Sequence, residues 1–272
     1  MAVRMDKKIL EDLALTNSYV FDSWAVTLAK IRKHVKTEIK DKVAKLSVCD
    51  NKNPCFQEVT LFFPMDYGRL ETAYTRTLAW LLDPKAPHGF KDKLVRALLA
   101  DLPEYSGEKI EINKVLSEKI VKPGRKNKNI KDGRIDVWIE GKEGSQKILV
   151  VIEAKIDAPE SLGQLEKYDV ELKKWETKGY AIRKVYLTTW GDIPRSAKQP
   201  SNWHTMRFSR LANILWDAGR CEESVQGYEF LRLYIAGILH DVLGLKLPIH
   251  EETDSPYEWL HFFQIYHSKE LT

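Results

Sequence analysis

Gly133-Arg-Ile-Asp136-Val-Trp-Ile-Glu140 and, after a short polar segment, Ile148-Leu-Val-Val-Ile-Glu153-Ala-Lys155 are the two stretches that decide the fold. β-Branched residues predominate in both, which predicts strands over Ile135–Ile139 and Ile148–Ile152. The second strand is apolar throughout, as expected of a central strand buried on both faces. A tight hairpin near residues 141–147 makes the two strands antiparallel neighbours in this prediction.

The flanking segments extend this pair into a sheet. Val115–Val121 and Lys184–Thr189 are also rich in β-branched residues, and they predict two more strands. Before the last strand, Pro159–Trp175 is expected to be a helix, with Pro159 in the first turn, where its missing N–H costs nothing. The order strand, strand, strand, helix, strand indicates an α/β fold with a central mixed sheet of four to five strands flanked by helices.

Apolar residues that recur every three or four positions predict helices before and after this sheet. A long amphipathic helix begins near Asn17 and ends at the Asn/Asp/Pro cluster of residues 50–54. Val59–Phe63 is apolar and is followed by Pro64, so we expect either a strand or a buried connector there. The other predicted helices cover residues 70–82, 90–99, 208–218 and 226–243.

The chain has no internal repeat and no low-complexity linker, so we expect a single domain over residues 1–272. Its length and 43% apolar content are ample for a sizeable core. Within the domain, residues 1–66 are the N-terminal long helix and connector, 67–192 the sheet-forming core, and 193–272 a helical C-terminal extension.

Composition indicates where the protein is located more than what it does. The net charge of +4 does not identify a nucleic-acid-binding protein, because phosphate contact depends on where Lys and Arg cluster. No apolar run approaches the roughly 18 residues that cross a bilayer, and the N-terminus lacks the apolar stretch of a signal peptide. The three cysteines form no CxxC pair, and an odd number cannot be fully paired. We therefore expect a cytoplasmic protein with no membrane partner.

Two acids and a lysine converge in the predicted strand pair. Glu153 and Lys155 are two residues apart and point to one face of their strand, and Asp136 on the neighbouring strand can approach the same pocket. Carboxylate oxygens suit a hard cation such as Mg²⁺ or Mn²⁺, which activates water and neutralises a phosphate. Lys155 can orient the attacking water or neutralise developing charge. This grouping favours metal-dependent hydrolysis of a phosphodiester.

The motif resembles that of the PD-(D/E)XK nuclease superfamily. The resemblance rests on Arg134-Ile-Asp136, then Ile-Glu153-Ala-Lys155, and Gln164 and Tyr168 on the following helix. Glu71, Leu78-Ala-Trp-Leu-Leu-Asp-Pro84 and His88-Gly89 resemble the upstream helix of a bacterial and phage branch of that superfamily, and Tyr186-Leu-Thr-Thr-Trp-Gly191 resembles its later strand. One departure is Ile rather than Pro before Asp136.

This resemblance implies a restriction-endonuclease-like core that cleaves DNA with Mg²⁺ or Mn²⁺. It implies that Asp136 and Glu153 ligate the metal, with the backbone carbonyl of Ala154, and that Lys155 acts on the water. Gln164 would support the site from its helix. Two more acids, Glu71 and Glu118, are candidates for a further ligand or a second metal.

Other segments leave alternatives open. The basic stretch before Asp136 either grips the nucleic-acid backbone or is a solvated loop; its candidate contacts are Lys122, Arg125, Lys126, Lys128, Lys131 and Arg134. Trp190 and Trp203 either stack on bases or pack in the protein. The long N-terminal helix is where we expect a homodimer contact, if one forms. The alternative function is a non-cleaving nucleic-acid-binding or assembly subunit on the same fold.

Overall fold

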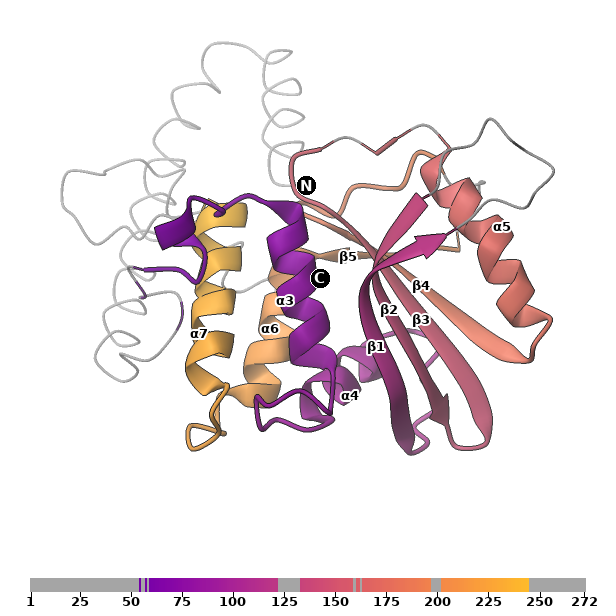
Figure 1. Cartoon of the computed structure of the whole chain (residues 1–272), viewed down its shortest axis with the longest axis horizontal. Coiled ribbons are helices and arrows are strands. Elements are labelled where there is room, and N and C mark those ends of the chain that lie inside the picture. The colour runs from indigo at the N-terminus through magenta and orange to yellow at the C-terminus, as the bar shows by residue number, and fades with distance from the viewer. Residues whose placement is uncertain are drawn as a thin grey trace, which may run out of the picture. The chain divides into compact units, whose positions relative to one another are not determined.

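In the computed structural model, the described residues are 54, 57, 59–121, 133–158, 160, 161, 163–196 and 202–244. All of them belong to one of the two units into which the chain divides, residues 52–246 together with 264–272. Figure 1 shows the described part as a twisted sheet with helices on both sides. The helix predicted from Asn17 lies outside the described residues.

Five strands form one sheet in the order β1-β2-β3-β4-β5. β1 (Ile110–Val121), β2 (Gly133–Glu143) and β3 (Gln146–Lys155) are antiparallel neighbours, and β4 (Tyr180–Thr188) and β5 (His204–Arg207) continue parallel to β3. The predicted mixed α/β sheet is confirmed. The sequence does not predict β5, because four residues are too few for an alternating pattern, and pairing with β4 is what makes them a strand.

A tight hairpin joins β2 to β3 through Gly144 and Ser145, within the predicted turn. Gly144 has a φ of 57°, a left-handed conformation that hairpin turns require and that glycine adopts without steric cost. Pairing runs from Glu143 opposite Gln146 to Val137 opposite Ile152. This register is what positions the acidic residues beyond its far end.

Helices cover both faces of the sheet (Figure 1). On one side, α3 (Glu71–Leu82) packs against β1, β2 and β3, and α4 (Lys93–Ala100), α6 (Phe208–Gly219) and α7 (Tyr228–Gly237) pack around it. A single π-helical turn, η3 (Ile238–Val242), continues α7. On the other side, α5 (Gln164–Glu176) contacts β2 and β4. No helix in these described ranges is long and apolar enough to cross a bilayer.

The core beneath α5 orients the reactive end of β3. Leu149 and Val151 of β3 are fully buried in one cluster with Leu165 and Leu172 of α5. Because side chains alternate along a strand, Glu153 and Lys155 continue the row that begins with Leu149 and Val151. The apolar half of this row packs against α5, and its polar half lies where β3 ends.

The segment Val59–Phe63 is a connector and not a strand. The Leu61 N–H donates to the carbonyl of Leu233 at 3.3 Å, and the Phe62 side chain is buried. A short 3₁₀ helix, η2 (Phe63–Met65), follows and leads to α3. Pro64 has no N–H, so it suits the start of such a turn better than the middle of a ladder.

Candidate active site

The two predicted acids lie where β2 and β3 stop pairing. The ladder ends at Val137 opposite Ile152, and Asp136 and Glu153 are the next residues on the two strands. Continuing the register by one step places them opposite each other. The backbone N–H of Ala154 donates to Asp136 Oδ2 at 2.8 Å, so the Asp136 side chain crosses to β3. Both acids are buried, Glu153 with only 1% of its surface exposed.

Lys155 connects this strand end to α3. Its ammonium nitrogen, Nζ, lies 2.6 Å from Glu153 Oε1 and 3.2 Å from Glu71 Oε1, and it donates to the Ala154 carbonyl at 2.8 Å. The other Glu71 oxygen accepts from the Ile156 N–H at 3.1 Å. Glu71 is the first residue of α3. The structure therefore brings Glu71 to the site through Lys155 and the backbone after it.

Gln164, the first residue of α5, reaches the site from the opposite face. Its amide nitrogen donates to Glu153 Oε1 and to the hydroxyl of Tyr168, the latter at 3.0 Å, and its amide oxygen accepts from the Ser161 N–H at 3.2 Å. The Tyr168 hydroxyl donates in turn to the Arg134 carbonyl. Glu153 Oε1 is thus held by Lys155 from its own strand and by Gln164 from α5.

Burial dominates the electrostatics of the acids. It raises the pKa of Asp136 to about 6, although the Ala154 N–H and the Lys155 charge act in the opposite direction. Burial and then the Asp136 charge raise the pKa of Glu153 to about 8, against the opposing effect of Lys155. For Lys155, burial disfavours the ammonium, but the charges of Glu153 and Glu71 outweigh it and the pKa is raised. Burial therefore disfavours the ionised form of both acids, most strongly that of Glu153, and added positive charge would favour it.

The residues present fit a hard divalent cation. Glu153 Oε2 is buried and has no hydrogen-bond partner among the described residues, so one carboxylate oxygen is left to accept a ligand bond. Oxygen donors with negative charge are what Mg²⁺ and Mn²⁺ prefer, and Mg²⁺ keeps several waters and needs only one or two carboxylates. In the described part of the chain, no three His, Cys, Asp or Glu side chains are grouped to hold a metal. A metal here would therefore depend on Asp136, Glu153, a backbone carbonyl and water.

Glu118 has two arginine neighbours. Its Oε1 lies 2.8 Å from Nη1 of Arg134, and its Oε2 accepts from Nε of Arg76 at 2.8 Å. Arg134 was among the basic residues predicted to contact nucleic acid. The other five, Lys122, Arg125, Lys126, Lys128 and Lys131, lie outside the described residues. Nothing in the sequence singles out Arg76, because an arginine on the exposed side of a helix carries no distinguishing pattern.

The two tryptophans, Trp190 and Trp203, differ in burial. Trp203 is buried, belongs to the cluster beneath α5, and its Nε1 donates to Asp169 Oδ1 at 3.1 Å, so the packing alternative describes it. Trp190, just after β4, has 54% of its surface exposed.

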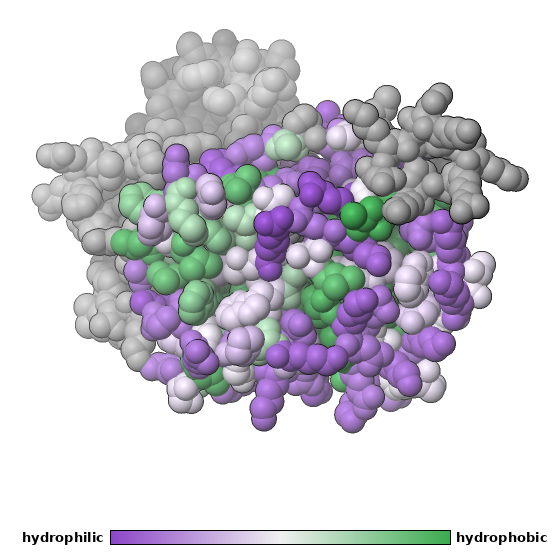
Figure 2. Space-filling model, in the orientation of Figure 1, coloured by the Kyte–Doolittle hydropathy of each residue, from purple (hydrophilic) through white to green (hydrophobic). Residues whose placement is uncertain are grey.

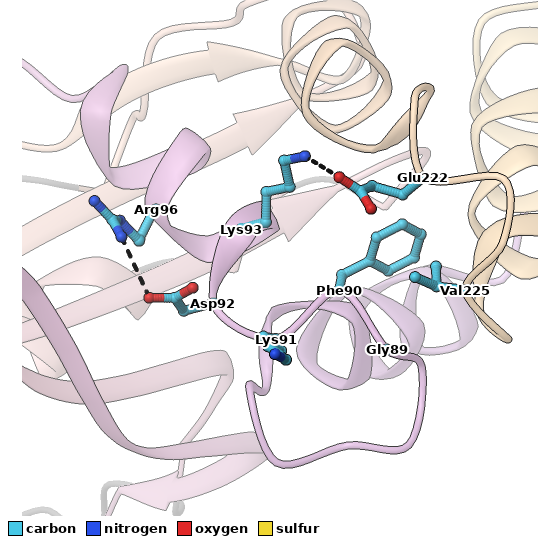
Figure 3. Close-up of a pocket in the computed structure, with 8 residues that line it drawn as sticks. All are labelled: Gly89, Phe90, Lys91, Asp92, Lys93, Arg96, Glu222 and Val225. Carbon is cyan, nitrogen blue, oxygen red and sulfur yellow. Dashed lines mark hydrogen bonds and ion pairs between the residues drawn. The ribbon is translucent and has the colours of Figure 1, made fainter.

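A pocket of about 580 Å³ lies elsewhere, between the start of α4 and the loop that precedes α7 (Figure 3). Lys93 pairs with Glu222 across it, and Arg96 pairs with Asp92, the residue just before α4. None of its lining residues belongs to the acidic site. Four of its charged side chains are joined in these two ion pairs.

Comparison with known proteins identifies a family. A family model described as PD-(D/E)XK nuclease superfamily matches residues 61–236, which includes the site and extends through α6 and most of α7. No curated protein and no solved structure matches.

Proposed function

The chain belongs to the PD-(D/E)XK nuclease superfamily, and from that premise we propose that it is a metal-dependent nuclease that hydrolyses phosphodiester bonds in DNA. The observation that supports this most is the placement of the Lys155 ammonium between Glu153 and Glu71, beside the buried Asp136. A lysine and buried acids in one polar cluster match what phosphodiester hydrolysis needs.

Asp136, Glu153 and the Ala154 carbonyl are the proposed ligands of Mg²⁺ or Mn²⁺. When bound, such an ion lowers the pKa of a water and stabilises charge on the phosphoryl oxygens. Ala154 also contributes the N–H that orients Asp136 Oδ2. This one residue of β3 would therefore supply its carbonyl as a ligand and hold the Asp136 ligand in place. Glu71 remains a candidate for a further ligand, although its two oxygens already accept from Lys155 and Ile156.

Lys155 is the proposed catalytic residue that orients the attacking water and neutralises charge on the phosphate. Its three N–H donors are shared among Glu153, Glu71 and the Ala154 carbonyl, which holds the ammonium near the acids. Gln164 restrains Glu153 from α5 and is proposed as a positioning residue. A fixed geometry of this kind reduces the reorganisation that the reaction requires.

The test is a cleavage assay on supercoiled, linear and single-stranded DNA, with Mg²⁺, with Mn²⁺ and with chelator. Wild type should cleave with metal and not with chelator, and Asp136→Ala and Lys155→Ala should lose at least about 100-fold in rate. Lys173→Ala, an exposed lysine on α5, is the control and should cleave like wild type. Persistent cleavage in both site variants refutes the assignment. Binding without cleavage by wild type would favour the non-cleaving subunit, and RNA arms test the choice of polymer.

Two parts of the proposal concern the setting. A cytoplasmic location rests on the odd number of cysteines, of which the described Cys221 is a free thiol. A homodimer through the predicted N-terminal helix rests on its amphipathic pattern and on the need for two centres to cut two strands. Sedimentation of the full chain, with and without DNA, tests the second point.

A further inference from the structure

Arg76 and Arg134 are held by the two oxygens of one carboxylate. Arg76 donates from Nε at 2.8 Å and from Nη2 to Glu118 Oε2, and Arg134 Nη1 lies 2.8 Å from Oε1. Arg76 comes from α3, Arg134 from β2 and Glu118 from β1. Three separate elements therefore bring two guanidinium groups together, and one carboxylate leaves them with a net positive charge.

This cluster lies beside the candidate active site. In the β1–β2 ladder Ser117 faces Val137 and Lys119 faces Ile135, so Glu118 falls opposite Asp136. Glu118, Asp136 and Glu153 are thus consecutive across β1, β2 and β3, and neighbouring strands are about 4.8 Å apart. Figure 1 shows α3 alongside this part of the sheet, and the same helix carries Glu71 at its start.

The backbone at Glu118 is strained. Its φ is 51°, in the left-handed region, although it lies within a strand and is not glycine. Its partner position, Asp136, is missing from a ladder whose neighbours on either side are paired. Strained residues of this kind concentrate at functional sites, where the surrounding structure maintains them.

A contribution to the stability of the fold does not explain why Arg76, Arg134 and Glu118 are brought together. The side chains of Arg76 and Arg134 are 61% and 60% exposed, and ion pairs that exposed add little stability. Within the described ranges, Glu118 is the acceptor that both guanidiniums contact, and more than half of each arginine side chain remains exposed to solvent. On the face drawn in Figure 2, hydrophilic residues predominate over the front of the sheet, whereas apolar ones gather over α7.

We propose that Arg76 and Arg134, oriented by Glu118, bind a backbone phosphate of the nucleic acid next to the one that is hydrolysed. The planar guanidinium matches the geometry of phosphate oxygens, and a carboxylate that fixes it beforehand lowers the ordering cost of binding. Glu118 is then a positioning residue and not a metal ligand. This inference rests on the proposed function and adds to it the way the substrate is held across β1 and β2.

The test measures binding of the full chain to a fluorescein-labelled DNA duplex by anisotropy, in chelator, over a series of NaCl concentrations. Arg76→Gln and Arg134→Gln should each raise Kd roughly 5–10-fold and reduce the slope of log K against log salt by about 0.9. Arg96→Gln, an exposed paired arginine on α4, is the matched control and should change neither quantity. Circular dichroism melts confirm that the variants fold.

Slopes equal to that of wild type in both variants, or no binding of the duplex by wild type, would overturn the inference. Glu118→Gln separates it from metal ligation: the Mg²⁺ concentration that half-saturates cleavage should stay within about threefold of wild type, whereas a metal ligand predicts an increase of tenfold or more. If wild type does not cleave DNA but the arginine variants still reduce the salt slope of binding, the nuclease proposal is refuted and the phosphate-binding site is supported. If wild type cleaves DNA but the variants leave the salt slope unchanged, the nuclease proposal is supported and the phosphate-binding site is refuted.

Discussion

Glu71 and Lys155 are 84 positions apart in the sequence, and the Lys155 ammonium lies 3.2 Å from Glu71 Oε1. The contact joins the first residue of α3 to the last residue of β3. The second Glu71 oxygen accepts from the Ile156 N–H, so the carboxylate bridges the lysine and the backbone that follows it. Glu71 thereby orients Lys155, which is the residue proposed to orient the attacking water.

Glu71→Gln should lower kcat of DNA cleavage about 10–100-fold, the range found when groups that orient a metal site are removed. The neutral amide keeps the shape but loses the charge that holds the Lys155 ammonium in place. Steady-state cleavage kinetics measure this, with Glu166→Gln, an exposed acid on α5, as the control. A kcat equal to that of the control variant would contradict the role given to Glu71.

Substitution of Gln164 should mainly reduce cleavage, whereas substitution of Tyr168 should mainly reduce stability. Gln164→Ala removes the α5 donor from Glu153 and should reduce cleavage about 10–100-fold with little change in urea midpoint, because Gln164 is only partly buried. Tyr168→Phe removes the donor to the Arg134 carbonyl from a fully buried ring. It should cost about 1–3 kcal/mol of unfolding free energy. Equal stability losses in the two variants would count against this division.

His88 should make the fold sensitive to acid. The ring is fully buried, Nδ1 accepts from the Phe90 N–H at 3.0 Å, and Nε2 lies 2.9 Å from the Asp83 carbonyl. Burial lowers the pKa of His88 below 6.5, despite the opposing effect of the Asp83 carbonyl. Because the unfolded imidazole takes up a proton near 6.5 and the folded one resists it, this contribution is present above pH 6.5 and is lost as pH falls.

The measurement is Tm at pH 7.5 and pH 5.5, in chelator, for wild type and His88→Gln. The variant should have a lower Tm at pH 7.5 and a smaller fall between the two pH values. His204→Gln should keep the wild-type difference. Comparing variants removes the contribution of the acidic site, which is common to all three. An unchanged difference in His88→Gln would show that the acid sensitivity arises elsewhere.

Glu143 and Arg183 form a buried pair at the hairpin end of the sheet, away from the acids. Their side chains are 4% and 5% exposed, and Glu143 also accepts from the N–H and hydroxyl of Ser106. Glu143→Gln leaves the guanidinium buried without a counter-charge and should cost about 3–5 kcal/mol by urea unfolding. The double variant Glu143→Leu with Arg183→Met should recover most of that loss. Glu111→Gln, in an exposed pair with Lys109, should change stability little.

Sequence pattern was sufficient for the centre of the sheet. The apolar run Ile148–Ile152 could be satisfied only by burial on both faces, and a short turn before it required antiparallel pairing with the strand that carries Asp136. Those two constraints bring Asp136 and Glu153 opposite each other without any knowledge of distant contacts. The family match over residues 61–236 agrees with the fold inferred in this way.

Contacts between elements far apart in the chain were decided by tertiary structure alone. The pairing of β5 with β4, the reach of Glu71 to Lys155 and the convergence of Arg76 and Arg134 on Glu118 all depend on how α3 crosses the sheet and on where the chain returns. Periodicity along a helix shows which face is buried, but the angle and position at which that face packs come from the partner surface. The sequence by itself therefore determined the central strands and the acids that they carry, and only the packing of α3 and α5 against the sheet brought the side chains that orient those acids into contact with them.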